Sequence, residues 1–83
     1  MNVWTVATGE VNPWKKKSRE AVDYIKTLEG LVAVHPAHGH GTLWLFDSEN
    51  NAKGAKNLME HNGIKTGRNI CKARIEGGTL VLD

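Results

Sequence analysis

The chain has 83 residues, of which 40% are hydrophobic and 24% are charged, and its formal net charge is +2. This length predicts one small domain over residues 1–83, and the composition excludes a disordered tail. The charge is too small to indicate a polyanionic partner by itself, so the positions of the basic residues matter more than their number.

The first third of the chain predicts a strand followed by an amphipathic helix. Residues 3–8 contain tryptophan, threonine and valine, which favour strands. Asn12 and Pro13 then provide a helix start, with asparagine as the cap and proline in the first turn. The predicted helix runs to Gly30 and carries one apolar stripe, formed by Trp14, Ser18, Ala21, Val22, Ile25 and Leu28.

The middle of the chain predicts two strands and a second helix. Residues 31–35 form a short β-rich run, and the loop from His35 to Gly41 separates it from the next strand. That strand, residues 42–47, is apolar on both faces, which is typical of the middle of a sheet. Asp47 and Ser48 supply a helix cap, and Ala52, Ala55, Leu58 and Met59 follow at helical spacing. The helix ends at Asn62-Gly63, where Ile64 is expected to fold back over the last turn.

The last part of the chain predicts a β-hairpin. Residues 70–76 alternate in polarity, with Cys71, Ala73 and Ile75 on one face and Lys72, Arg74 and Glu76 on the other. Gly77-Gly78 is a two-residue turn signal, and residues 79–82 form the final strand. This turn pairs Ile75 with Leu80 and Ala73 with Leu82, which places apolar residues of both strands on one face.

The order β-α-β-β-α-β with one extra strand predicts an α+β fold of the ferredoxin-like, split βαβ type. Its antiparallel sheet would have the strand order 2-3-1-4-5, with both helices on one face. A doubly wound parallel sheet is the main alternative. It would need a crossover between the second and third strands, and the loop at residues 35–41 is too short for one.

This topology gathers basic residues at one end of the sheet, because three loops share that end. The loops contribute Lys15, Lys16 and Lys17, then His35, His38 and His40, then His61, Lys65 and Arg68. The opposite end carries Glu29, Asp47, Glu49, Glu76 and Asp83. The three lysines oppose the helix dipole by up to a few tenths of a kcal/mol each, and a bound anion would remove that cost. The alternative is that exposed lysines only keep a small protein soluble.

The second candidate surface is the sheet face that the helices leave open. If Leu43 and Leu45 face the helices, then Trp44 and Phe46 stand on the open face, beside basic residues of the fourth strand. Aromatics on a central strand form the stacking platform of many single-strand nucleic-acid binders. The arrangement resembles that of RNA-recognition-motif domains, whose sequence signature the chain lacks. The alternative is that these aromatics form the core or a self-association surface.

Metal and enzyme interpretations receive less support from the sequence. His35, His38 and His40 would supply three nitrogen ligands, with His61 or Glu10 as a possible fourth. Histidines in glycine- and proline-containing loops are commonly unliganded, and we expect no metal and no cofactor. Cys71 lies on the apparent core face, where a thiol is normally inert. No nucleophile–base order and no phosphate-binding loop is present, so we expect a non-catalytic protein.

We therefore predict a small binding module that engages nucleic acid, or a nucleic-acid-processing protein, through its basic end and open sheet face. The contacts are assigned to Lys15, Lys16, Lys17, Arg19, Trp44, Phe46, Lys65, Arg68, Lys72 and Arg74. The alternative is a protein-binding adaptor or inhibitor, such as an anti-defence protein of a phage or mobile element, that docks through the aromatic face. A metal- or ligand-sensing histidine loop is third, and a homodimer through the open face is a further expectation.

Compartment follows from two absences in the sequence. The single cysteine, Cys71, excludes an internal disulfide and fits a reducing compartment. No apolar run reaches membrane-spanning length, and residues 1–8 lack a signal-peptide pattern. We expect a cytoplasmic or, equally, a nuclear protein that does not bind membranes.

Overall fold

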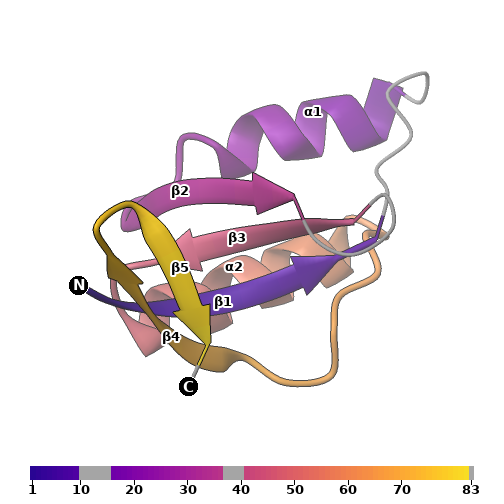
Figure 1. The fold of residues 1–83 in the computed structure, drawn as a ribbon. Helices are drawn as coiled ribbons and strands as arrows, with labels where there is room; N and C mark the ends of the chain where they lie inside the picture. Colours follow the sequence, from indigo (N-terminus) through magenta and orange to yellow (C-terminus); the bar gives the residue numbers. More distant parts are fainter. Residues whose placement is uncertain (10–15, 37–40, 83) are drawn as a thin grey trace.

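The computed structural model of the protein describes residues 1–9, 16–36 and 41–82, with the backbone alone for residues 16–18 and 21. Its elements are β1 (Asn2–Thr8), α1 (Lys16–Ile25), β2 (Leu31–Pro36), β3 (Thr42–Phe46), α2 (Glu49–His61), β4 (Cys71–Glu76) and β5 (Thr79–Leu82). The five strands form one antiparallel sheet in the order β2-β3-β1-β4-β5, which is the predicted strand order (Figure 1). β3 lies inside the sheet, as its two apolar faces predict.

Helix α2 begins and ends where the sequence predicts. The Ser48 hydroxyl accepts a hydrogen bond from the backbone N–H of Asn51 at 3.2 Å, which caps the first turn. At the other end, the N–H of Ile64 donates to the carbonyl of Met59 at 2.9 Å, and that of Gly63 to Glu60 at 3.0 Å. This pair of bonds is a Schellman motif, and it brings buried Ile64 back onto the helix, which confirms the prediction.

Helix α1 is shorter than predicted at its C-terminal end. It stops at Ile25, and the chain then turns until Gly30. The N–H groups of Thr27 and Leu28 donate to carbonyls three residues earlier at 3.0 Å, and the Thr27 hydroxyl donates to the Tyr24 carbonyl at 2.6 Å. The side chain of Thr27 thus competes for a helical carbonyl and ends the helix early. The predicted start at Asn12-Pro13 lies outside the described residues.

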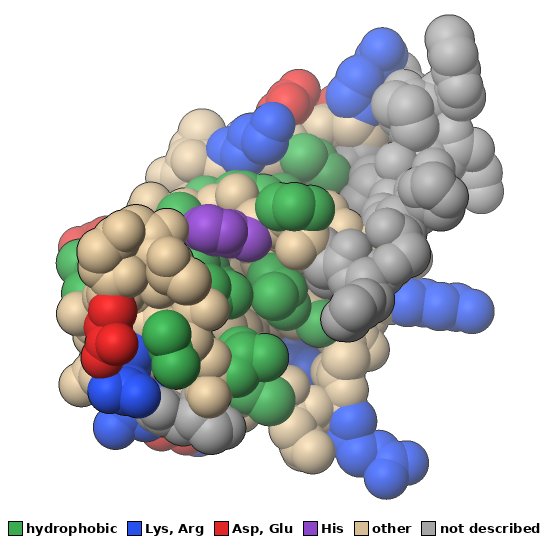
Figure 2. All heavy atoms as spheres, in the orientation of Figure 1, with side chains coloured by type: hydrophobic (Ala, Val, Ile, Leu, Met, Phe, Trp, Pro, Cys, Tyr) green, Lys and Arg blue, Asp and Glu red, His purple; other side chains and the backbone are tan. Residues whose placement is uncertain are grey.

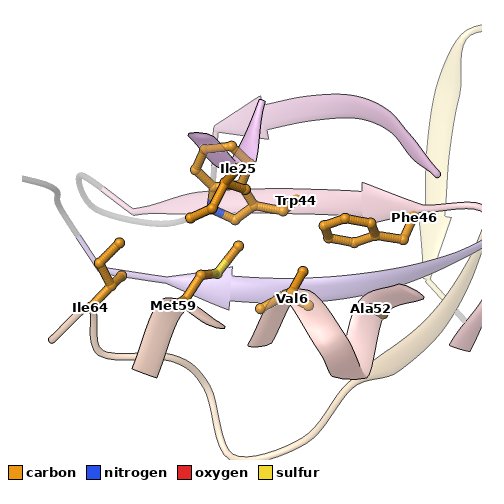
Figure 3. Packing of buried hydrophobic residues seen from close by; sticks show 8 residues of the cluster. Val6, Ile25, Trp44, Phe46, Ala52, Met59 and Ile64 are labelled. Atoms are coloured by element: carbon orange, nitrogen blue, oxygen red, sulfur yellow. The ribbon is translucent and has the colours of Figure 1, made fainter. Parts of the chain in front are cut away.

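The main core lies between the sheet and the helices, and it contains both aromatic side chains of β3 (Figure 3). Its buried members are Val6, Ile25, Trp44, Phe46, Ala52, Ala55, Met59 and Ile64. Trp44 is 3% exposed and Phe46 is 0% exposed, so the prediction that they stand on an open face is wrong. The physical reason is volume: α2 presents the small side chains Ala52 and Ala55 to the sheet, and large rings fill the space that they leave. The Trp44 indole N–H is satisfied by the Thr8 hydroxyl, to which it donates at 3.0 Å.

The other face of the sheet carries a second, smaller core. Val3, Leu45 and Ala73 are fully buried there, with Ala33, Leu43, Ile75 and Leu80 packed around them. Neither described helix covers this side; instead the β4–β5 hairpin curls across it, so that β5 passes in front of β1 in Figure 1. The hairpin has the predicted register, with Ile75 opposite Leu80 and Ala73 opposite Leu82. Positive φ angles of +55° and +81° at its turn explain the need for Gly77-Gly78.

Candidate functional site

The described elements that flank the predicted basic loops meet at one end of the sheet. Thr42, at the start of β3, is opposite both Thr8 at the end of β1 and Pro36 at the end of β2. Helix α1 begins and α2 ends at the same side of the molecule (Figure 1). We define the basic end by the described residues His35, His61, Lys65 and Arg68, together with the backbone start of α1 at Lys16 and Lys17. Lys15, His38 and His40 lie outside the described residues.

The loop between α2 and β4 holds Lys65 and Arg68 in place. The N–H of Gly67 donates to the Ala7 carbonyl at 2.7 Å, and the N–H of Gly9 donates to the Lys65 carbonyl at 3.4 Å. A further β-bridge joins Thr66 to Thr8. Both cationic side chains are exposed, and Lys and Arg side chains project at this end in Figure 2. The backbone that carries these two cations is therefore anchored to a central strand.

Glu60, a described acidic residue that contacts this loop, already has partners of its own. A single oxygen of Glu60 accepts hydrogen bonds from Lys56 Nζ at 2.5 Å and from the Thr66 hydroxyl at 2.6 Å. The bond from Lys56, and then the one from Thr66, lower the pKa of Glu60 below its ordinary value of 4.5. Glu60 therefore stays ionised and bonded to Lys56, and it does not form an ion pair with Lys65 or Arg68.

The opposite end of the sheet is acidic, as predicted. It carries Glu29, Asp47, Glu49 and Glu76, while Asp83 lies outside the described residues. Glu49 pairs with Lys53 at 3.0 Å, Glu76 pairs with Arg74 at 2.8 Å, and Asp47 accepts a hydrogen bond from Asn51 at 3.0 Å. Within the described part of the chain, Glu29 forms no ion pair. Lys53 and Arg74 thus offset two of the acidic charges at this end.

The predicted stacking platform does not exist, although its members do share a face. Strand register places Trp4 between Phe46 on one side and Lys72 on the other. This is the face that carries the helices, so the aromatics of β3 offer no surface to a base. Lys72, the exposed member of these three residues, instead forms a cation–π contact with Trp4. Its Nζ lies 6.0 Å from the centre of the Trp4 ring. Sequence reasoning missed half-buried Trp4, although its two-residue spacing from buried Val6 indicates the shared face.

The remaining predicted candidates stand apart from the basic end or from one another. Arg19 is exposed on α1, and Arg74 is held by its pair with Glu76 on β4. Cys71 was expected on the core face and is exposed, which corrects that prediction. The reason is that β5 ends opposite Ala73, so its described residues do not reach far enough along β4 to cover the thiol.

The described residues contain no metal-binding group and no membrane-spanning helix. His35 is half-buried at the end of β2, whereas two of its predicted co-ligands, His38 and His40, fall outside the description. Among residues 1–9, 16–36 and 41–82, no group of three histidine, cysteine or acidic side chains is placed to hold a metal ion. No helix in the same ranges is long and apolar enough to cross a membrane. No protein-family model, curated protein or solved structure matches the chain.

Proposed function

We propose that the protein is a non-catalytic binding module that engages nucleic acid, or a protein that handles nucleic acid, through its basic end. The observation that supports this most is the anchored loop that presents Lys65 and Arg68. Neither side chain has a described acidic partner, and the carboxylate of Glu60, which bonds to Thr66 of this loop, is also paired with Lys56. The anchored backbone of this loop has little further entropy to lose when its cations meet a phosphate.

The contact is to the phosphate backbone and involves no base stacking by β3. Trp44 and Phe46 are buried under the helices, so they are withdrawn from the interface. Binding by cations alone is independent of sequence and falls steeply with salt. Each phosphate neutralised on a single strand contributes about 0.7 to the slope of log K against log salt. Lys65 and Arg68 together would therefore account for a slope of about 1.4.

The proposed test removes the charges of Lys65 and Arg68, and its control removes two positive charges at the opposite end of the sheet. The test variant is the double substitution Lys65→Gln, Arg68→Gln, and the control is Lys26→Gln, Lys53→Gln. Each variant removes two positive charges from a protein whose formal net charge is +2. All four side chains are exposed, so both proteins should fold. Affinity for a fluorescent single-stranded oligonucleotide is measured by anisotropy across a salt series.

The first variant should lose affinity and lower the salt slope by about 1.4, whereas the control should retain the slope. Equal losses in the two variants would show that only net charge matters. Absence of wild-type binding at about 20 mM salt, where screening is weakest, would overturn the proposal.

We further infer that the fold is the ferredoxin-like, split βαβ arrangement with an added C-terminal strand. The element order, the strand order and the shared core of the two helices support this inference. The arrangement matters for the proposal because it is what brings the ends of β1, β2 and α2 together.

The alternative, a protein-binding adaptor or inhibitor, requires a surface other than the buried aromatics of β3. A homodimer through the second face would use the rim of the smaller core, where Leu82 is 63% exposed. Sedimentation analysis over a range of protein concentrations tests this, and a Leu82→Ser variant should weaken any such dimer.

A further inference from the structure

A hollow of about 190 Å³ lies between the loop that follows α1 and the first turns of α2. Its floor is apolar, formed by Leu28, Ala55 and Leu58, and its rim includes Glu29, Asn50 and Gly54. Clefts that bind small molecules typically enclose about 300–1,000 Å³, so this hollow is of a size for one side chain.

The wall of the hollow is rigidly attached to α2. The N–H of Asp47 donates to the Gly30 carbonyl at 2.8 Å, and Asp47 also accepts from the Asn51 side chain at 3.0 Å. Gly30 has a φ of +86°, and a Cβ there would collide with the side chains of Asn51 and Asp47. The loop that carries Leu28 and Glu29 is therefore held closely against the start of α2.

Gly54 is unusual for its position, because it lies in the middle of α2 and is exposed. A glycine in a helix interior is less favourable than alanine. A Cβ at Gly54 would meet no described atom within 4 Å, so no contact inside the described chain requires the glycine. Its effect is to leave the hollow open where a side chain would otherwise cover it.

The charges around the hollow favour a cationic occupant. Glu29 stands at the rim, is exposed, and has no ion pair among the described residues. Asp47 lies on the same end of the molecule, and Glu49 is already paired with Lys53. The methylene groups of a long basic side chain would cover the apolar floor, while its head group would reach the Glu29 carboxylate. An acidic occupant would form no ion pair with Glu29.

We propose that this hollow receives a lysine or arginine side chain of a partner polypeptide. The site is at the acidic end, opposite the proposed phosphate contacts, so it is a second and separate interaction surface. Binding here does not depend on Lys65 or Arg68, and the two proposals fail independently.

The test uses a capped Ala-Arg-Ala tripeptide as the probe, with capped Ala-Ala-Ala and Ala-Glu-Ala as controls. Amide chemical shifts of the isotopically labelled protein are followed by NMR during titration. The arginine peptide should shift the signals of Leu28, Glu29 and Gly54 with a dissociation constant of about 1–10 mM, as expected for so few contact atoms. The two control peptides should not. Equal shifts with all three peptides, or no shift at about 20 mM, would overturn the proposal.

Three variants separate a built site from general charge attraction. Glu29→Gln should weaken the affinity for the arginine peptide by about two- to fivefold, as expected for the loss of one exposed ion pair. Asp23→Asn removes an exposed carboxylate from α1, outside the hollow, and should leave the affinity unchanged. Gly54→Leu introduces a good helix former that covers the hollow, and it should abolish the shifts while the circular dichroism spectrum is retained. Retained binding in Gly54→Leu, or equal effects of Glu29→Gln and Asp23→Asn, would contradict the assignment.

Discussion

The hydrogen bond between Trp44 and Thr8 provides a direct test of the corrected position of β3. Both residues are buried, and the indole N–H donates to the Thr8 hydroxyl at 3.0 Å. Thr8→Val keeps the shape of the side chain but removes the acceptor, which leaves a buried N–H without a partner. Such an unsatisfied donor destabilises a protein by about 1–3 kcal/mol.

The matched control is Thr5→Val, the same change at an equally buried position in the same strand. Thr5 does not bond to the indole, and β-branched valine suits a strand, so this change should alter stability by less than about 0.5 kcal/mol. A protein of this size is stable by about 4–12 kcal/mol, so the loss in Thr8→Val should be plainly measurable.

The assay is urea denaturation followed by far-ultraviolet circular dichroism, which does not rely on the fluorescence of Trp44. The reasoning predicts that Thr8→Val is less stable than Thr5→Val by about 1–3 kcal/mol, with equal urea slopes. A difference below about 0.5 kcal/mol would refute it, because an indole N–H that reaches water loses nothing when Thr8 is changed. In that case Trp44 would again be available to a ligand.

The other predictions concern two glycines and one titrating group. Gly30→Ala should destabilise the protein by about 1–3 kcal/mol, because it combines a positive φ with a collision against Asn51; thermal unfolding measures this. Gly54→Ala should instead stabilise it by about 0.5–1 kcal/mol, and a loss of stability would show that the position is crowded. The carboxyl of Glu60 should titrate below its ordinary pKa of 4.5, as followed by carbon NMR, and Lys56→Met should raise the value more than Thr66→Val. Because the pKa is lowered in the folded state, the stabilisation is present above pH 4.5 and is lost as the pH falls through the folded value, so a Glu60 that titrates at or above 4.5 would contradict the network.

The sequence predicts the hairpin register because it depends on a local turn signal, and it predicts the strand order from the order of the elements along the chain. A two-residue turn at Gly77-Gly78 leaves one pairing that places Ile75 and Leu80 on the same face. The basic end follows from topology alone, since the order of elements decides which loops share an end. The anchoring of Lys65 and Arg68 could not be predicted, because it rests on backbone bonds to β1.

The face of β3 was mispredicted because its sequence has no polar residue to distinguish the two sides. Leu43 and Leu45 alternate with Trp44 and Phe46, so periodicity allows either orientation. The orientation of β3 is decided by how well its side chains fill the space against the helices. A pattern of hydrophobic positions carries no information about that fit. Lys72 and Arg74 share the face of these aromatics, but that face carries the helices and is not open. The exposure of Cys71 has a separate cause, since β5 ends opposite Ala73.

The central position of β1 has a consequence for how the sheet assembles. Thr5 pairs with Leu45 on one side and with Cys71 on the other, so both partners of this strand come from much later in the chain. The β2–β3 and β4–β5 pairs are close in sequence and are able to form early, whereas β1 gains its bonds only when both hairpins are ready. Until then, a strand that carries buried residues on both faces has two unpaired edges. We therefore expect the pairing of β1 to be the slow step of folding, and β1 to be open to aggregation until it pairs.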